Sequence, residues 1–326
     1  MNDHSPRRYK GTLLERAAEQ FHYGQPPVIP PVAEPRPAAP VQTYTAPAPV
    51  PQAPIEDVYE LEAPAIRRGY AAEEPVQKIA AGRRAATIDR EALRTGGMIV
   101  PGGSITPLAE EFRLVKRQLL LTARTVSGKD AQRARMILVC SAQPNEGKTF
   151  CAINLALSMA AEKDVEILLV DADFAKPDVL NRLGIPEGPG LLDVLSGAVA
   201  NAEDCIVETD VPQLCVLPAG TKSHSDTEML ASDRARAVLD GLAAANPRRI
   251  VIFDSPPALA ASPASVLALH VGQVMLVVRA DRTSESDLRA AVNTLDACEH
   301  IQLVLNSVSF QPAGRRFGSY YEEAGK

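Results

Sequence analysis

Apolar and polar positions alternate in blocks from Thr106 onward. Continuous apolar runs such as "MILVC" (136–140) and "RIVIFDS" (249–255) are typical of strands buried on both faces. Between such runs lie segments with apolar residues at helical spacing, for example "DRARAVLDGLAAA" (233–245). Buried strands that alternate with amphipathic helices predict a doubly wound α/β fold, with a mostly parallel sheet covered by helices on both faces. In such folds ligands bind at the carboxyl ends of the strands.

The predicted elements follow one another between residues 107 and 307. Apolar residues at helical spacing predict helices at 107–123, 149–162, 190–197, 233–245, 262–270 and 285–297. Short apolar runs predict strands at 136–140, 166–173, 214–220, 249–255, 274–280 and 301–307. The sequence has no internal repeat, so we assign residues 98–310 to one α/β domain.

The first 97 residues differ in composition from the rest. Residues 24 to about 80 are rich in Pro and Ala, and proline lacks a backbone N–H and fixes φ, so this stretch cannot join a sheet or a helix interior. We expect a disordered, extended linker over residues 24–97, which serves as a tether or as a ligand for a proline-recognising domain. The sequence of residues 1–23 predicts a short amphipathic helix, which either docks on a partner or a membrane surface or frays in water.

Composition and charge narrow the choice of partner and compartment. The formal net charge of −6 argues against a general nucleic-acid binder. Five scattered cysteines without a CxxC pair fit a reducing cytoplasm. The start of the chain leads into no apolar signal segment, and no apolar run approaches the roughly 18 residues that cross a bilayer. We therefore expect a cytoplasmic protein that meets the membrane through a partner or a peripheral segment.

A phosphate-binding loop follows the first predicted strand of the domain. The segment "SAQPNEGKTF" (141–150) matches G-x-x-x-x-G-K-[ST] except that Ala142 replaces the first glycine. Alanine is small enough for the tight turn, and Asn145 tolerates the positive φ that such loops require. The strand before the loop and the helix after it predict a nucleotide-binding site rather than a chance match. The predicted ATP-binding residues of the loop are Gln143, Pro144, Asn145, Glu146, Gly147, Lys148, Thr149 and Phe150.

Three carboxylates stand at the ends of predicted strands. Asp171 and Asp173 end "EILLVDAD", where a period of two points both side chains the same way, and Asp254 ends "RIVIFDS". Beside a phosphate loop, such carboxylates suit Mg²⁺ coordination and activation of a hydroxyl or a water. The alternative for each is an aspartate that only caps a helix or a turn.

The motif set resembles a known family. The loop, "VDADFAKPDVL", "GLLDVLSG", "LPAG", "EMLAS", "FDSPP" and "VLN" occur in the order found in the bacterial tyrosine kinases of exopolysaccharide export, the BY-kinase family. The likeness covers residues 98–321 and is greatest to the exosortase-associated tyrosine autokinase branch. It implies an ATP-dependent protein-tyrosine autokinase that regulates exopolysaccharide or capsule polymerisation and export.

The resemblance also implies roles for single residues. It makes Asp171 the general base, with Lys148 and Asp173 as further catalytic residues. Magnesium would be held by Thr149, Asp173 and Asp254, and Asn306 would lie near the adenine. The cofactors implied are therefore ATP and Mg²⁺.

Two further resemblances concern assembly. The first predicted helix carries Glu110, Arg113 and Lys116 where the family has an E-x-x-R-x-x-R motif for subunit contacts, so a ring-like homo-oligomer is expected; a solvated charged face is the alternative. The flexible tail, residues 311–326, carries Tyr320 and Tyr321 where the family has autophosphorylated tyrosines, although these could instead pack on the surface. The family further implies a separate inner-membrane chain-length regulator and a cognate tyrosine phosphatase as partners.

Two other functional classes share the same fold. A ParA/MinD-type positioning ATPase would carry an extra lysine five residues before the loop lysine, and Gln143 stands there. A non-catalytic, ATP-binding regulator of a polysaccharide co-polymerase would bind Mg-ATP in the same way. Labelling the protein with ATP and mapping phosphotyrosine distinguishes these classes from a kinase.

Overall fold

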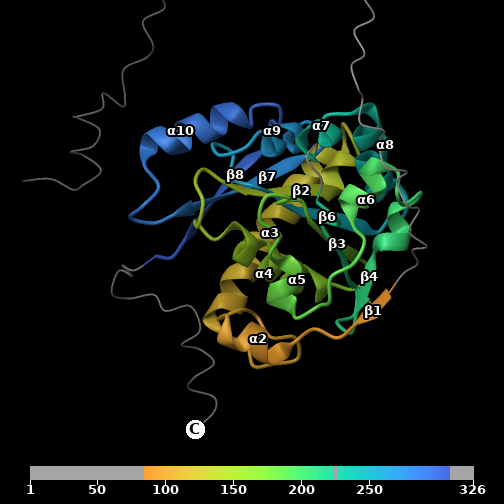
Figure 1. Ribbon diagram of the computed structural model, residues 1–326. Coiled ribbons are helices and arrows are strands. Elements are labelled where there is room, and N and C mark those ends of the chain that lie inside the picture. Colours follow the sequence, from red (N-terminus) through yellow and green to blue (C-terminus); the bar gives the residue numbers. More distant parts are fainter. Residues whose placement is uncertain (1–83, 223–225, 309–326) are drawn as a thin grey trace, which may run out of the picture. The chain divides into compact units, whose positions relative to one another are not determined.

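An eight-stranded sheet forms the centre of the region that the computed structural model describes, residues 84–222 and 226–308 (Figure 1). The strands are β1 (Arg84–Ala86), β2 (Met136–Ser141), β3 (Glu166–Asp171), β4 (Val207–Thr209), β5 (Leu214–Leu217), β6 (Arg249–Asp254), β7 (Gln273–Arg279) and β8 (Ile301–Asn306). Their order in the sheet is β1-β4-β5-β3-β6-β2-β7-β8.

The strand directions place the loops of the predicted site together. Neighbouring strands are parallel except β4 and β5, which are antiparallel. The carboxyl ends of β2, β3, β6, β7 and β8 therefore meet at one edge of the sheet, here called the C-terminal edge. The predicted doubly wound, mostly parallel fold is confirmed.

Helices cover both faces of the sheet (Figure 1). One face carries α2 (Arg90–Thr95), α3 (Pro107–Ser127), α4 (Lys148–Ala160) and α5 (Val179–Leu183). The other carries α6 (Leu191–Ser196), α7 (Asp226–Leu230), α8 (Asp233–Ala244), α9 (Pro263–Ala268) and α10 (Glu285–Thr294). Short 3-10 helices, η1 (Arg133–Arg135) and η2 (Ala202–Cys205), precede β2 and β4. In the part of the chain described here, no helix has the length and apolarity to cross a membrane.

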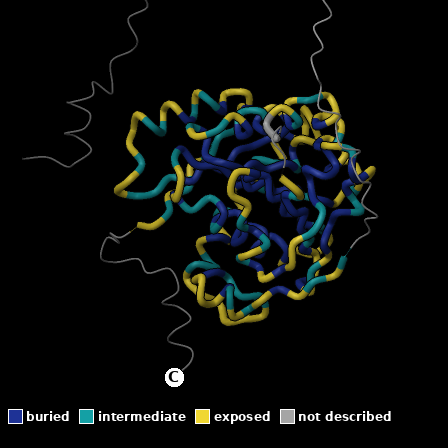
Figure 2. Tube along the Cα trace, viewed as in Figure 1, coloured by how far each residue is buried: buried dark blue, intermediate teal, exposed yellow. Residues whose placement is uncertain are grey.

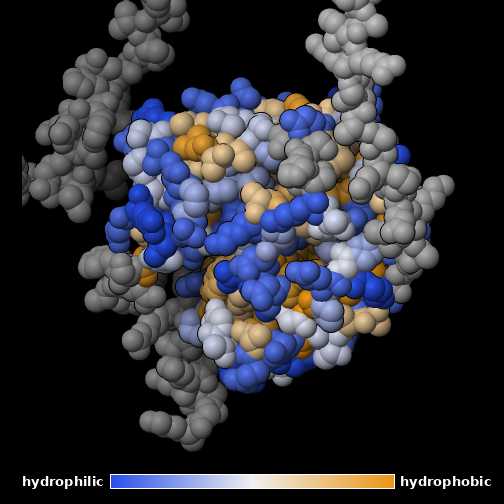
Figure 3. All heavy atoms as spheres, in the orientation of Figure 1, coloured by the Kyte–Doolittle hydropathy of each residue, from blue (hydrophilic) through white to orange (hydrophobic). Residues whose placement is uncertain are grey.

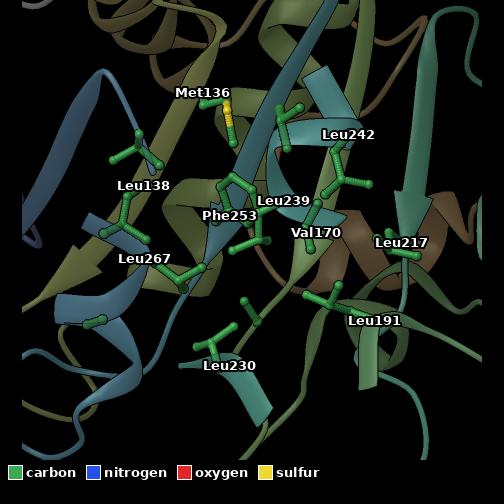
Figure 4. Close-up of a cluster of buried hydrophobic side chains, with 14 of the residues drawn as sticks. Met136, Leu138, Val170, Leu191, Leu217, Leu230, Leu239, Leu242, Phe253 and Leu267 are labelled. Atoms are coloured by element: carbon green, nitrogen blue, oxygen red, sulfur yellow. The ribbon is translucent and has the colours of Figure 1, made fainter. Parts of the chain in front are cut away.

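Two apolar layers separate the sheet from its helices. Alternate residues of β2 enter opposite layers, since Met136 and Leu138 pack with α8 and α9 whereas Ile137 and Val139 pack with α3 and α4. Figure 4 shows the first layer, where Phe253 of β6 lies among leucines of the surrounding helices. The central strands are buried along their whole length (Figure 2), which explains their continuous apolar sequences.

The folded domain begins before residue 98, so the linker boundary predicted at 97 is wrong. Strand β1 pairs with β4, and α2 begins after Asp89, whose carboxylate accepts hydrogen bonds from the Glu91 and Ala92 N–H groups. Ile88 and Leu93 are fully buried against the domain. This segment is stabilised by contacts with residues more than 100 positions away, such as the Asp210 carboxylate that accepts from the Ile88 N–H at 2.8 Å. A local sequence pattern cannot report such contacts.

Candidate active site

The predicted phosphate loop joins β2 to the first residue of α4 at the C-terminal edge. Asn145 has φ 64° and Gly147, the N-cap of α4, has φ 97°, so both occupy the left-handed region. The positive φ predicted for Asn145 is confirmed. The first turn of α4 consequently presents unpaired N–H groups and the positive end of the helix dipole toward the space above the loop. An anion binds favourably at such a place.

The back of the loop is supported by β7 and β8. Arg279 donates to the Asn145 carbonyl at 2.9 Å, and the Asn306 amide donates to the Glu146 carbonyl at 2.9 Å. Gly147 has φ 97°, which favours glycine, and a Cβ there would lie 2.1 Å from Asn306 Nδ2 and would displace that amide. Asn306 thus touches the loop, where it positions the backbone; the predicted contact with adenine stays a prediction.

Glu146 also supports the loop from within. Its buried carboxylate accepts from the Gln143 N–H at 2.9 Å and from the Thr283 hydroxyl. Glu146 and Gln143 were expected among the nucleotide-binding residues on the loop pattern alone. The structure places the Glu146 side chain in the wall of the loop, where it fixes the turn.

A cavity of about 360 Å³ lies over the loop. Six of the predicted loop residues line it, together with residues that follow β3 and β6, such as Asp173 and Pro256. Lys176 and Arg182 add positive charge to the rim. The loop residues that line it are Pro144, Asn145, Gly147, Lys148, Thr149 and Phe150.

Lys148 and Asp173 face each other across this cavity. The Lys148 ammonium lies 2.7 Å from an oxygen of Asp173, and both side chains are largely buried. Burial alone would lower the pKa of Lys148, but the carboxylates of Asp254 and Asp173 outweigh it and raise the pKa. The lysine therefore carries its charge at neutral pH and is paired with Asp173.

Asp254 and Asp171 are neighbours in the sheet, since they are register partners at the ends of β6 and β3. Asp254 is fully buried, and neither of its oxygens has a hydrogen-bond partner. Burial raises its pKa to about 8, although the nearby Lys148 charge opposes the shift. A buried carboxylate with two free oxygens is costly unless a cation binds it, so this position fits a metal ligand.

Asp171 differs from Asp173 in its surroundings. Its Oδ2 accepts from the Asp178 and Val179 N–H groups at 3.1 Å each, whereas its buried Oδ1 has no partner. Burial raises the pKa of Asp171 to about 7, and the charge of Asp173 acts in the same direction. Asp171 lines a second, larger cavity beside the first one. Strand β3 ends at Asp171, so the period of two does not continue to Asp173, and the two carboxylates line different cavities.

The donor set fits Mg²⁺ only together with other ligands. Within the described residues, no group of three or more His, Cys, Asp or Glu side chains could hold a metal ion. Magnesium usually binds through one or two protein oxygens, with substrate phosphates and waters completing its shell. The free oxygens of Asp254 and the hydroxyl of Thr149 at the start of α4 are suited to that arrangement.

Glu110, Arg113 and Lys116, which were predicted to contact a neighbouring subunit, lie in different surroundings on α3. Glu110 and Arg113 form an ion pair on the outer face of α3. Lys116 is buried, donates to the Ser158 carbonyl at 3.0 Å and pairs with Glu162 at 2.7 Å. Lys116 therefore anchors α3 to the end of α4, and the subunit contact of Glu110, Arg113 and Lys116 stays a prediction. Tyr320, Tyr321 and the predicted helix in residues 1–23 lie outside the described residues.

Asp193 is not among the predicted site residues, although it lies in the segment "GLLDVLSG" (190–197) quoted for the resemblance. It lies in the first turn of α6, is almost fully buried, and accepts from the Gly190 N–H at 2.8 Å and the Thr221 N–H at 3.1 Å. These bonds tie together two loops next to Asp171. The only local signal was a carboxylate three residues after a glycine at a helix start, which is common to many helices.

Comparison with known proteins agrees with this geometry. The AAA domain family matches residues 134–306. Tyrosine-protein kinase YwqD of Bacillus subtilis is 29% identical over 52% of this chain and 69% of its own length. Tyrosine-protein kinase wzc of Salmonella typhimurium is 26% identical over 57% of this chain and 26% of its own. The solved kinase domain of Escherichia coli tyrosine kinase ETK is 26% identical, with a TM-score of 0.51 over 57% of this chain and 72% of that one.

The fold, the phosphate loop and the carboxylates at the strand ends define a P-loop nucleotide-binding protein, and the chain belongs to the AAA domain family. Its named relatives are bacterial tyrosine kinases, so the resemblance indicated by the sequence is confirmed at the level of that group. The exosortase-associated branch stays a prediction. The chain spans about a quarter of the length of several of these curated relatives.

Proposed function

We propose that this protein is an ATP-dependent protein-tyrosine autokinase that regulates exopolysaccharide polymerisation and export. The observation that carries the proposal is the group formed by Lys148, Asp173 and two buried carboxylates with free oxygens at the mouth of a phosphate loop. A loop that only senses nucleotide does not need a carboxyl group such as that of Asp171 beside it, whose pKa is raised to about 7. The tyrosine-kinase relatives support the same reaction.

The residues divide the chemistry among them. The first turn of α4 and Lys148 bind the phosphates of ATP, and Lys148 exchanges Asp173 for the β- and γ-phosphate oxygens. Thr149, Asp173 and Asp254 would hold Mg²⁺, and the ion would offset the negative charge of the phosphates. Asp171 acts as the general base through Oδ1, the oxygen that makes no hydrogen bond. A base with a pKa near the working pH suits proton transfer from a tyrosine hydroxyl.

The acceptors and partners complete the proposal. Tyr320 and Tyr321 of one copy are phosphorylated by a neighbouring copy in a ring-like homo-oligomer. A separate inner-membrane chain-length regulator holds the otherwise cytoplasmic protein at the membrane, and a tyrosine phosphatase reverses the modification. The Pro/Ala-rich linker before residue 84 serves as a tether.

The test is a mixture of two full-length chains incubated with ATP and Mg²⁺. One chain is active and carries Tyr320→Phe and Tyr321→Phe; the other is inactive through Lys148→Met. Mass spectrometry should find phosphate on Tyr320 or Tyr321 of the inactive chain. Phosphate confined to the linker tyrosines would refute the tail assignment, and no phosphotyrosine on either chain would refute the kinase. Lys148→Arg, which keeps the charge, serves as the conservative control.

A further inference from the structure

A groove of about 530 Å³ lies between α3 and the turn after α4. We call it the basic groove, because three arginines and Lys116 line it together with two leucines and Glu162. The helix α4 has 13 residues, and its length of about 20 Å separates the basic groove from the phosphate loop at its other end. The basic groove is therefore distinct from the candidate active site. Its arginines are Arg113, Arg117 and Arg124, and its leucines are Leu120 and Leu121.

The arginines form one stripe along α3. Arg117 lies four residues after Arg113 and seven before Arg124, a spacing that places all three on one face of a helix. Leu121, which is 49% exposed, lies on the same face. Exposed leucines alone do not identify a site, because apolar patches also lie among hydrophilic side chains on the face that Figure 3 shows. The stripe is distinguished by its charge, since α3 has no acidic residue from position 112 to its end.

Two of the four cations lack an acidic partner. Arg113 and Lys116 take part in the ion pairs described above. Arg117 and Arg124 are exposed, and among the residues that the structure describes neither has an ion-pair partner. Arginine binds phosphate through two parallel N–H donors. The basic groove therefore fits a ligand that combines phosphate with an apolar ring, as phosphotyrosine does.

We propose that the basic groove binds the C-terminal segment 309–326 after phosphorylation of Tyr320 and Tyr321. The inference rests on the proposed function, which supplies the phosphates. Arg117 and Arg124 bind the phosphate groups, and the exposed leucine of the stripe contacts a tyrosine ring.

Phosphorylation reverses the charge of this segment. Its side chains carry three positive charges, on Arg315, Arg316 and Lys326, and two negative charges, on Glu322 and Glu323. The unphosphorylated segment is therefore slightly positive, and a basic surface does not attract it. Each phosphate adds about −1.5 to −2 charges at pH 7, so two of them make the segment strongly acidic next to the tyrosines. Binding should therefore depend on phosphorylation.

The position of β8 brings the segment within reach of the basic groove. The Gln302 side chain of β8 donates to the Thr122 hydroxyl of α3 at 2.9 Å. From Gln302 the strand continues for four residues, or roughly 13 Å, to Asn306. Tyr320 follows 14 residues later, and a chain of that length extends up to about 46 Å. The segment is therefore long enough to return to α3 of the same chain.

Synthetic peptides test the assignment without the need for kinase activity. Fluorescent peptides of residues 309–326 are prepared without phosphate and with phosphate on both tyrosines. Each is titrated, without nucleotide, into a full-length parent chain that carries Tyr320→Phe and Tyr321→Phe, so that its own tail cannot be phosphorylated. Vesicles of phosphatidylserine and phosphatidylcholine are a second probe, because anionic headgroups also bind basic surfaces.

Two pairs of substitutions in the parent chain have the same effect on net charge. The groove variant adds Arg117→Gln and Arg124→Gln. The matched control adds Arg236→Gln and Arg248→Gln, at exposed positions outside α3. Glutamine keeps a long polar side chain in each case, so the two variants differ mainly in the place where charge is lost.

We expect the groove variant to bind the phosphorylated peptide about tenfold more weakly than the parent, or weaker still, and the control to equal the parent. The parent should bind the unphosphorylated peptide more weakly by a similar factor. Equal affinity of the phosphorylated peptide for parent and groove variant, or no binding by the parent, overturns the inference. Vesicle binding that the groove variant loses, together with peptide binding that it keeps, assigns the groove to a membrane surface and also overturns the inference.

Failure of the proposed function gives a different result. If the synthetic phosphopeptide binds as expected but the protein itself forms no phosphotyrosine with ATP, the basic groove is supported and the kinase proposal alone is refuted. If phosphotyrosine forms but the groove variant binds the phosphopeptide like the parent, the kinase proposal stands and the groove assignment is refuted.

Discussion

Replacing Asp254 with asparagine is expected to stabilise the nucleotide-free protein. The Asp254 carboxylate is fully buried without a hydrogen-bond partner, and burial raises its pKa from the ordinary 3.8 to about 8. Above pH 3.8 the unfolded chain releases this proton while the folded protein keeps it, so stability falls as the pH rises from about 4 to about 8. Asparagine has almost the same shape and cannot ionise in either state.

The size of the effect follows from the pKa difference. One pKa unit corresponds to about 1.4 kcal/mol, so the ionisation of Asp254 lowers the free energy of unfolding by on the order of 4 kcal/mol at pH 7 and by about 1 kcal/mol at pH 4.5. Asp254→Asn should recover most of that loss. For a domain of this size the gain at pH 7 corresponds to a rise in Tm of roughly 10 °C.

Thermal unfolding of wild type and variant at pH 4.5 and pH 7, without nucleotide, measures this gain. Asp296→Asn, at an exposed position, is the matched control and should change Tm little at either pH. Adding Mg-ATP should stabilise wild type and leave Asp254→Asn unchanged, because the variant lacks the proposed metal ligand. A variant no more stable than wild type at pH 7, or one that gains as much at pH 4.5, would refute the reasoning.

Three further predictions concern packing, the loop and assembly. Asp193→Ala should lower the free energy of unfolding by about 2–4 kcal/mol, since two backbone N–H groups lose a charged acceptor; an unchanged urea midpoint would contradict this. Asn145→Gly should keep the affinity for nucleotide, whereas Asn145→Val should weaken it. The backbone φ of 64° costs a β-branched residue about 1–2 kcal/mol. Equal affinities of the two variants in titration calorimetry would contradict the loop geometry. The double variant Glu110→Ala, Arg113→Ala should shift the mass measured by light scattering toward the monomer. Replacement of the exposed ion pair of Glu285 and Arg289 on α10 is the control and should leave the mass unchanged. One exposed ion pair contributes only about 0–1 kcal/mol, but each subunit contact of a ring would contain one.

Local patterns explain which parts of the fold could be predicted from the sequence. The strands β2 and β6 are buried on both faces, so their sequences are continuously apolar, and the phosphate loop lies between a strand and a helix as expected. The left-handed backbone of Asn145 could be predicted because few residues tolerate it. These features depend on residues close together in the chain.

Features that depend on distant contacts could not be predicted. The strand β1 has three residues and exists through its pairing with β4. The buried position of Lys116 depends on the end of α4, and that of Asp193 on Thr221, 28 residues away. Asp171 and Asp173 line different cavities, and β3 ends at Asp171, whereas the sequence pattern continued the strand to Asp173; strand boundaries are the least regular part of such a pattern.

The hydrogen bond from Asn306 to the Glu146 carbonyl has a practical consequence for shortened forms of this protein. Residue 306 is both the last residue of β8 and a support for the phosphate loop, and the chain continues from it toward Tyr320. A deletion that starts after residue 308 removes the segment with the tail tyrosines and keeps the Asn306 support of the loop. A deletion that starts before residue 306 also removes the loop support, so its loss of phosphorylation could not be attributed to missing acceptors.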